Sequence, residues 1–207
     1  MELHYLIGDA TDPVVKPATI CHVCNDCRPG KWGAGFVMAL SRKNKDPQEA
    51  YMKWSNQPDY ALGAVQLIPF AEDVLVANMI AQHDVRWNGK VPPIRYDALE
   101  QCLSSVYKHC LNTSRTLHMP RIGCVLAGGS WDLIEAIIKK VMTVDTYVYT
   151  IAEQKDRWPT QYEDVAIIPP VAPHTALRGV PQEMTYLDDN GSFPGDDINE
   201  DLSSYFR

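Results

Sequence analysis

The sequence predicts an α/β domain built on a mixed sheet, and three observations carry that prediction. Short apolar or alternating runs typical of strands alternate with segments whose apolar residues recur every three or four positions. A glycine-rich turn at residues 24–36 follows a predicted strand and precedes a predicted helix. A second such turn lies at residues 120–130. Domains with this alternation pack their helices against a sheet.

The N-terminal half contains four predicted strands and two predicted helices. An alternating run ends at Gly8, and a second strand, rich in small and β-branched residues, ends just before Cys24. Pro47 suits the first turn of a helix, and we expect Asp46 to cap that helix. The predicted strands cover residues 2–7, 18–23, 63–70 and 74–80, and the predicted helices cover residues 36–42 and 47–55.

The C-terminal half begins with a polar segment, residues 82–93, whose Asn-Gly and Pro-Pro pairs predict a loop. Helices are predicted over residues 95–111 and 131–142, the second capped by Ser130, and strands over 116–119 and 145–151. We expect these helix residues to face the core: Leu99, Leu103, Val106 and Leu111 from the first, and Leu133, Ile134, Ile137, Ile138 and Val141 from the second.

The composition changes after residue 151. Prolines interrupt residues 152–187, and the chain turns acidic and turn-rich from residue 188. We therefore predict one domain over residues 1–151, an irregular Pro-rich extension packed on it over 152–187, and a mobile acidic tail over 188–207.

Composition and charge narrow the function classes. The 207 residues are 45% hydrophobic and 22% charged, as in ordinary globular proteins. Neither an apolar run of about 20 residues nor a signal-peptide pattern is present, so we expect a cytoplasmic protein without membrane contact. The formal charge of −7 argues against non-specific nucleic-acid binding.

Six cysteines raise the question of a metal site. Cys24 and Cys27 are spaced C-x-x-C, but Cys102, Cys110 and Cys124 supply no second pair at zinc spacing. We therefore expect free thiols and no metal, with Cys102 and Cys110 sharing one partly buried helix face.

The first glycine-rich turn has the character of an anion site. Gly30, Gly33 and Gly35 let the backbone approach a ligand closely, and a helix beginning at Phe36 adds unpaired N–H groups that favour phosphate. Such turns also occur for purely steric reasons, but a second turn of the same kind favours a shared ligand site. In an acidic chain, oriented backbone groups would hold an anionic ligand.

Together these features resemble the macro domain, an ADP-ribose-binding fold, over residues 3–151. The resemblance implies a three-layer α/β/α arrangement with a mixed central sheet. Its last motif is similar to the branch containing terminal ADP-ribose protein glycohydrolase and the yeast ADP-ribose-1″-phosphate phosphatase. The motifs that carry it are Gly8-Asp9-Ala10-Thr11, Trp32-Gly33-Ala34-Gly35 and Met119-Pro120-Arg121-Ile122-Gly123-Cys124.

The resemblance assigns roles to individual residues. Asp9 would accept a hydrogen bond from the adenine amino group, the backbone at Ala10 would complete adenine recognition, and Tyr149 would pack near adenine. Asn25 would contact the distal ribose, and Trp32 and Gln82 would also line the site. Two segments would wrap the pyrophosphate: Gly33, Ala34, Gly35 and Phe36, and Gly123, Cys124, Val125, Leu126 and Ala127.

Each role has a plainer alternative. Asp9 could be an ordinary turn aspartate, Asn25 a buried loop-capping residue, and Tyr149 a core side chain. The sequence also departs from the family's hydrolytic patterns, because Gln82, Ala127 and Val37 stand where catalytic lysine or aspartate residues would be expected. None of these three side chains can act as a nucleophile or move a proton.

Two hypotheses of function remain open. We favour a hydrolase acting on the distal ribose of an ADP-ribose derivative, resembling ADP-ribose-1″-phosphate phosphatase, over a non-catalytic module that binds ADP-ribose or an ADP-ribosylated macromolecule. Neither requires a cofactor. Asn25 and His83 are the predicted catalytic residues, His83 because histidine ordinarily titrates near pH 6.5. Asp26 and His22 are further proton-handling candidates, but a solvated loop charge and a buried strand histidine are their alternatives.

Overall fold

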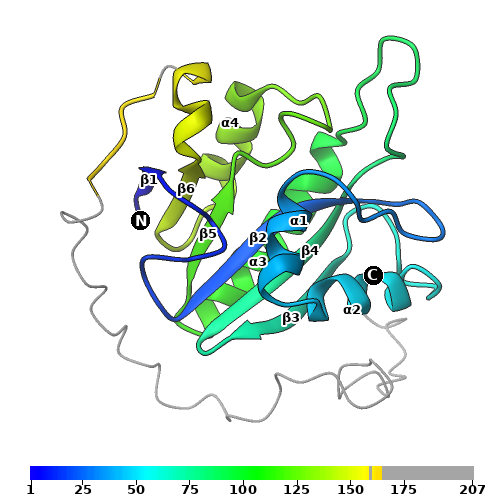
Figure 1. Ribbon diagram of the computed structural model, residues 1–207, viewed down its shortest axis with the longest axis horizontal. Helices are drawn as coiled ribbons and strands as arrows, with labels where there is room; N and C mark the ends of the chain where they lie inside the picture. The colour runs from blue at the N-terminus through cyan, green and yellow to red at the C-terminus, as the bar shows by residue number, and fades with distance from the viewer. Residues whose placement is uncertain (159, 165–207) are drawn as a thin grey trace, which may run out of the picture. The chain divides into compact units, whose positions relative to one another are not determined.

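The computed structural model describes residues 1–158 and 160–164, and the elements follow each other in the predicted order (Figure 1). The predicted tail and residues 165–187 of the predicted extension lie outside the described part. The strands are β1 (Leu3–Ile7), β2 (Ala18–Asn25), β3 (Val65–Ala71), β4 (Val74–Gln82), β5 (Thr116–Pro120) and β6 (Thr146–Thr150). The helices are α1 (Phe36–Lys43), α2 (Asp46–Trp54), α3 (Tyr96–Asn112), α4 (Trp131–Val141) and the 3₁₀ helix η1 (Ala152–Arg157).

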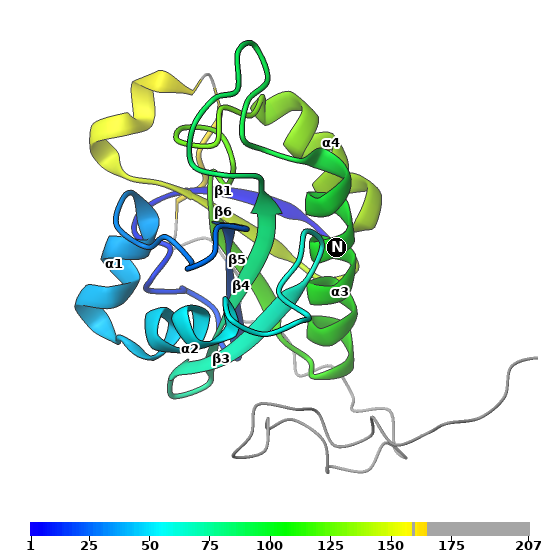
Figure 2. The same cartoon turned by 90° about the vertical axis from the view of Figure 1, so that its right-hand side faces the viewer.

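The six strands form one mixed sheet in the order β1-β6-β5-β2-β4-β3. Every neighbouring pair is parallel except β3 and β4, which are antiparallel and joined by a short turn. Helices α1 and α2 lie on one face and α3 and α4 on the other (Figure 2). The predicted three-layer α/β/α fold with a mixed central sheet is therefore confirmed.

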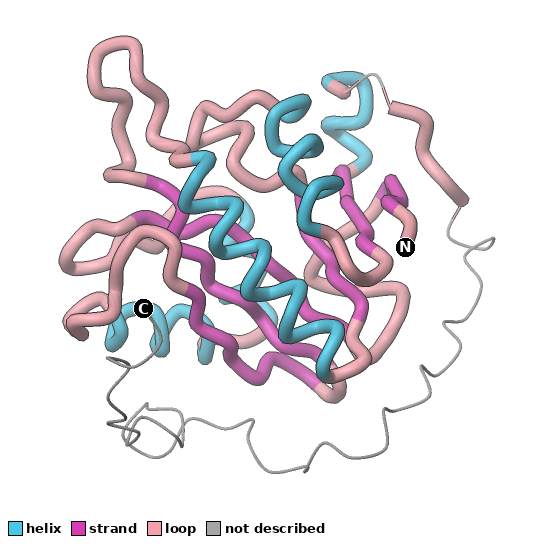
Figure 3. Tube along the Cα trace, turned by 180° about the vertical axis from the view of Figure 1, so that it is seen from behind, coloured by secondary structure: helices cyan, strands magenta, loops and turns pink. Residues whose placement is uncertain are grey.

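The core is divided between the two faces of the sheet. One large cluster joins α3 and α4 to the sheet, and α3 runs along that face with α4 beside it (Figure 3). Smaller clusters lie under α1 and α2. Strand β2 contributes to both faces and is buried along almost its whole length, as expected for a central parallel strand. Within the described residues, no helix is long and apolar enough to cross a membrane.

Two predicted core residues are wrong. Leu111 and Leu133 are 54% and 53% exposed. Leu103 and Val106 are followed on the buried side of α3 by Cys110, so Leu111 is turned by about 100° from that side. On α4, Ile134 and Ile138 are fully buried, whereas Leu133 lies on the outer face. Cys102 and Cys110 are fully buried rather than partly so.

The predicted cap position of Ser130 is confirmed, whereas that of Asp46 is wrong. Asp46 is the first residue of α2, not its cap, and the Asn44 side chain accepts a hydrogen bond from the Asp46 N–H at 2.8 Å. Ser130 does precede α4, but its hydroxyl makes no capping bond. The Ser130 N–H instead donates to the Tyr96 hydroxyl at 2.9 Å. The Asn44 side chain thus bonds the first N–H of α2, whereas the Tyr96 hydroxyl bonds the N–H of Ser130 itself, ahead of α4.

Candidate functional site

The loops that carry the predicted site all follow parallel strands. Because β1, β2, β4, β5 and β6 run in the same direction, their C-terminal ends lie along one edge of the sheet. That edge is the usual ligand-binding edge of an open α/β sheet. Four of the five segments that follow those ends carry predicted site residues: the turn after β1, the loop at residues 26–35, the segment after β4, and the loop at residues 121–130.

The turn after β1 carries an exposed carboxylate, that of Asp9, next to a buried residue, Ala10. The exposed Asp9 uses Oδ1 to accept the Thr11 N–H at 2.9 Å, and no described group is bonded to its Oδ2. Ala10 is 3% exposed and packs in one cluster with Tyr149 and Phe36. This cluster brings together three predicted site residues from the turn, from β6 and from the start of α1.

The Tyr149 side chain is buried, and its hydroxyl is hydrogen-bonded within the protein. It is 4% exposed, and its hydroxyl accepts the Val14 N–H at 3.1 Å and lies 2.9 Å from His118 Nδ1. The Thr116 hydroxyl donates to the Pro17 carbonyl at 3.3 Å and therefore accepts from His118 Nε2 at 2.9 Å, which leaves Nδ1 of the neutral ring to accept from the Tyr149 hydroxyl. Burial lowers the pKa of His118 to about 3. The Tyr149 side chain thus ties the segment behind Asp9 to the sheet, and its ring faces Gly8.

Asn25 organises its own loop. It is 6% exposed, and its Nδ2 donates to the Lys31 carbonyl at 2.7 Å. Its Oδ1 accepts the N–H groups of Cys27 at 3.2 Å and Lys31 at 3.3 Å. The amide therefore holds the loop closed across six residues, which is the loop-capping arrangement considered from the sequence.

Two buried tyrosines, Tyr51 and Tyr60, stabilise the start of the same loop. The hydroxyls of Tyr51 and Tyr60 lie 2.9 and 2.6 Å from the Asn25 carbonyl oxygen. The Tyr51 ring also passes so close to Gly30 that a Cβ there would lie 2.6 Å from Cε1. Real Cβ atoms essentially never show contacts under 3.0 Å, so this ring requires glycine at position 30.

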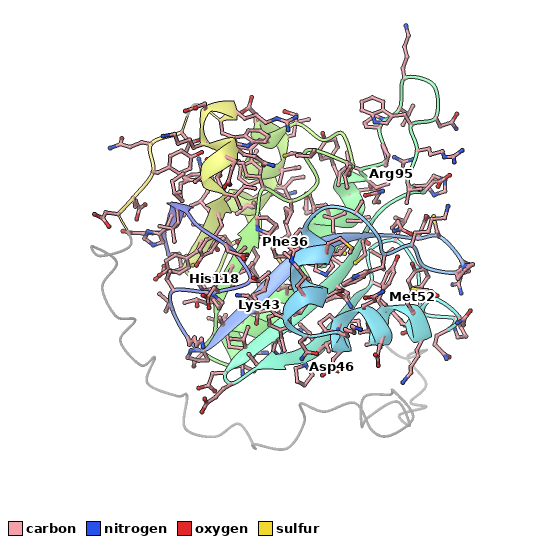
Figure 4. The ribbon with its side chains drawn as sticks, in the orientation of Figure 1. Phe36, Lys43, Asp46, Met52, Arg95 and His118 are labelled. Carbon is pink, nitrogen blue, oxygen red and sulfur yellow. The ribbon has the colours of Figure 1, made fainter. Side chains whose placement is uncertain are left out.

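The rest of the first glycine-rich turn is open to solvent. Gly33, Ala34 and Gly35 are exposed, and Gly35 adopts a φ of +73°, which favours glycine. Helix α1 begins immediately afterwards at Phe36 (Figure 4) and has no acidic residue in its first turn. Trp32 does not join this open stretch, because its indole N–H donates to Ser41 Oγ at 2.8 Å and its ring packs edge-on against His22.

The second glycine-rich loop reaches the first. The Leu126 side chain lies 3.1 Å from where a Cβ on Gly35 would be, so the two loops touch. Val125 and Leu126 are about half exposed at the tip, whereas Ala127 is buried. Gly123 has a φ of +71°, and its carbonyl accepts the Gly129 N–H at 2.8 Å, which closes the loop. Cys124 lies inside it, and burial raises the pKa of its thiol to about 11.

Arg121 anchors the start of this loop. Its guanidinium lies 5.0, 4.8 and 4.8 Å from the ring centroids of Tyr5, Trp131 and Trp158. Its Nη2 donates to Thr160 Oγ1 at 2.7 Å. Arg121 therefore joins the described part of the C-terminal extension to the loop.

The segment after β4 supplies a histidine–carboxylate pair. His83 Nδ1 lies 2.7 Å from Asp26 Oδ2, and Asp26 Oδ1 accepts the Asp84 N–H at 2.9 Å. Because a carboxylate only accepts, Nδ1 carries a proton, and Nε2 of the neutral ring is an acceptor. The His83 side chain is 59% exposed and that of Asp26 20%. Gln82 is largely buried, and its Nε2 donates to the Asp84 carbonyl at 2.7 Å.

Residues 83–95, called the β4–α3 hairpin here, connect the two glycine-rich loops and project from the edge of the sheet (Figure 1). The hairpin meets the first loop through the pair of His83 and Asp26. It meets the second loop where the Trp87 ring packs against Gly128, and where the Ile94 N–H donates to the Ala127 carbonyl at 3.0 Å. A cavity of 260 Å³ lies within the hairpin.

Other predicted candidates take structural positions. His22 is buried, donates from Nε2 to Asn78 Oδ1 at 2.7 Å, and has its pKa lowered by burial to about 4. It is therefore a strand histidine of the core. All six cysteines lie in the described part of the chain and are unpaired. Among the described residues, no group of three His, Cys, Asp or Glu is placed to hold a metal ion.

Sequence reasoning missed three features of the site. It gave Asp26 and His83 as separate proton-handling candidates and did not pair them. The tyrosine pair under Asn25 and the packing of Trp87 on Gly128 were also not predicted. A tryptophan within a polar segment was the available signal for the last of these. No local pattern indicated the other two, because they depend on contacts between distant segments.

Two comparisons with known proteins found similar chains, whereas no family model matches. A solved protein of unknown function from Bacteroides thetaiotaomicron is 47% identical, with 72% of this chain and 98% of that one covered and a TM-score of 0.67. A macrodomain protein from Streptomyces coelicolor is 38% identical, with 72% and 99% covered and a TM-score of 0.63.

Two curated proteins are also similar. A chromodomain-helicase-DNA-binding protein 1-like from Mus musculus is 30% identical over 168 residues, 75% of this chain but 18% of that protein, so the chain spans less than a fifth of it. An ADP-ribose 1″-phosphate phosphatase from Lodderomyces elongisporus is 24% identical over 162 residues, 73% of this chain and 99% of that protein. Since the macrodomain from Streptomyces is matched over almost its whole length, this chain belongs to the macrodomain family.

Proposed function

We propose that this protein binds ADP-ribose along the C-terminal edge of the sheet and hydrolyses an ADP-ribose derivative at the distal ribose. The name of the similar phosphatase supports ADP-ribose-1″-phosphate as the substrate class. The geometry that supports binding is the meeting of two glycine-rich loops, together with the exposed carboxylate of Asp9 at the same edge of the sheet. An ADP-ribosylated macromolecule could present the same ADP-ribosyl group.

The pyrophosphate would lie where the loops meet. Gly33, Ala34 and Gly35 expose their backbone, and the first turn of α1 contributes N–H groups without an acidic side chain to oppose an anion. Adenine would lie at the other end, where Asp9 Oδ2 can accept its amino hydrogen. In this arrangement Tyr149 acts from the interior, because its hydroxyl holds Val14 and its ring backs Gly8.

The pair of His83 and Asp26 is the observation that carries the proposed chemistry. Asp26 fixes the tautomer in which Nε2 of His83 can accept a proton from water. The water oxygen attacks phosphorus, and the bond between phosphorus and the distal-ribose oxygen breaks. The leaving ribose oxygen takes the proton back from the His83 imidazolium, so that ADP-ribose and inorganic phosphate are the products. Asn25 takes part through the loop shape that its amide fixes, since its own polar atoms are bonded to Lys31 and Cys27.

A non-catalytic binding module is the second candidate, and the residues at the usual catalytic positions favour it. Gln82 is bonded within the protein, Val37 cannot move a proton, and Ala127 is buried. If no turnover occurs, the same loops would hold ADP-ribose or an ADP-ribosylated partner unchanged.

The test compares wild type with His83→Gln, which can still donate a hydrogen bond to Asp26 but cannot act as a base. We expect calorimetry to give similar ADP-ribose affinities, and phosphate release from ADP-ribose-1″-phosphate to fall by about 10²–10⁴-fold in the variant. Full activity in His83→Gln would exclude the general-base role. Binding by wild type without turnover of ADP-ribose-1″-phosphate or an ADP-ribosylated protein would establish the binding module, and absence of binding would refute the proposal.

A further inference from the structure

The β4–α3 hairpin is basic in an acidic protein. Its residues include three cations, Arg86, Lys90 and Arg95, and one carboxylate, Asp84, so the hairpin has a net charge of +2 with His83 counted as neutral, against −7 for the whole chain. This local excess of positive charge lies at the end of the proposed site that would hold the distal ribose.

The hairpin is held in a defined shape. Asn88 and Val91 exchange two backbone hydrogen bonds at 3.2 and 3.0 Å, and the His83 N–H donates to the Pro93 carbonyl at 2.8 Å. At its base, Trp87 packs on Gly128 and the pair of His83 and Asp26 ties it to the first loop. A group bound inside the hairpin would therefore keep a fixed position relative to both glycine-rich loops.

The 260 Å³ cavity within this hairpin is lined by cations and an aromatic ring. Its walls include His83, Asp84, Arg86, Trp87, Val91 and Arg95. The Arg95 guanidinium, at the base of the hairpin (Figure 4), is fixed because Nη1 donates to the carbonyls of Pro92, Pro93 and Ile94 at 2.7, 3.0 and 2.9 Å. Among the described residues, no group is hydrogen-bonded to Arg95 Nη2 or paired with Arg86.

The single carboxylate of the hairpin, Asp84, already has partners for one of its oxygens. Asp84 Oδ1 accepts the Val85 N–H at 2.6 Å, and it lies 3.6 Å from the Cys27 thiol and 4.0 Å from Lys31 Nζ. The negative charge of Asp84 is therefore partly balanced by Lys31 of the first loop. The cations that line the cavity leave guanidinium donors of Arg86 and Arg95 uncommitted, and the fork geometry of these donors suits the oxygens of phosphate.

We propose that this cavity binds a phosphate group carried by the substrate beyond the distal ribose, with Arg86 and Arg95 as its donors. The inference rests on the proposed function, since it assumes that ADP-ribose occupies the adjoining loops. The phosphate would belong either to the 1″-phosphate ester itself or to the backbone of an ADP-ribosylated nucleic acid. Because the cavity is separate from the proposed adenine and pyrophosphate contacts, plain ADP-ribose would not use it.

The test measures three ligands against four proteins. Wild type, Arg86→Ala, Arg86→Lys and the matched control Lys90→Ala, which removes the same charge from the hairpin outside the cavity, are titrated with ADP-ribose. They are then assayed with ADP-ribose-1″-phosphate and with an oligonucleotide carrying one ADP-ribosyl group. The readout is KM where the ligand is turned over and Kd where it is not.

We expect Arg86→Ala to weaken binding of at least one phosphate-bearing ligand by about tenfold, with a smaller loss in Arg86→Lys and none in Lys90→Ala. The ligand affected identifies the source of the phosphate. ADP-ribose affinity should stay within about twofold in all four proteins. Equal losses for ADP-ribose, equal effects of Lys90→Ala, or no effect of Arg86→Ala would overturn the inference. Failure of wild type to bind ADP-ribose would instead refute the proposed function beneath it.

Discussion

Two buried histidines should make the fold sensitive to mild acid. His22 and His118 are 2% and 0% exposed, and burial lowers the pKa of His22 to about 4 and that of His118 to about 3. In the unfolded chain both would titrate near the ordinary value of about 6.5. Below pH 6.5 the unfolded state therefore binds protons that the folded state does not, and stability falls as the pH falls.

The magnitude follows from these pKa values. At pH 5 both side chains stay neutral in the folded protein. In the unfolded chain both are protonated, because this pH lies about 1.5 units below the ordinary histidine pKa. Each histidine then lowers the free energy of unfolding by about 2 kcal/mol relative to pH 8. The loss continues until the pH reaches the folded pKa values. The interval from pH 8 to 5 lies above the ordinary range of carboxyl groups, so the two histidines can be observed before acid titrates the carboxylates.

Urea unfolding followed by tryptophan fluorescence at pH 8 and pH 5 measures this effect. His118→Gln is the informative variant, because glutamine can accept from the Tyr149 hydroxyl and donate to Thr116. We expect it to be less stable than wild type at pH 8 but to lose about 2 kcal/mol less on going to pH 5. NMR of wild type provides a second measurement, in which two imidazoles should not titrate above pH 5. Equal acid losses in both proteins, with all imidazoles titrating normally, would refute the reasoning.

Two further substitutions test the loops. Asp9→Ala should weaken ADP-ribose binding by about 1.5–3 kcal/mol in calorimetry, the range for a hydrogen bond to a charged group, and an unchanged affinity would remove the adenine contact. Gly30→Ala should lower the free energy of unfolding by about 1–3 kcal/mol because the Cβ would overlap the Tyr51 ring. Gly33→Ala, with nothing within 4 Å of its Cβ, is the control, and equal losses in the two variants would contradict the packing argument.

The order of elements could be predicted because each depends on local sequence. The alternation of β1, the apolar run of β2 and the glycines before α1 are visible in short windows. The errors in caps and core residues arose where contacts in the folded protein override a local sequence preference. Ser130 occupies the predicted cap position of α4, yet its hydroxyl makes no capping bond. Leu111 suits a helix interior by type, yet Cys110 takes the buried position.

Local sequence patterns could not predict the pair of His83 and Asp26, because the pair depends on the register between two strands. The two residues are 57 positions apart, and β2 and β4 become neighbours only through the sheet order. Cys24 pairs with Ile80, and unbroken pairing would place Asn25 opposite Ala81 and Asp26 opposite Gln82. An irregularity between Cys24 and Asn25 shifts the register by one residue, so Asn25 pairs with Gln82 and the next residues, Asp26 and His83, meet. The proposed catalytic pair is therefore created by a single-residue shift at the end of a buried strand, where the Tyr51 and Tyr60 hydroxyls hold the Asn25 carbonyl.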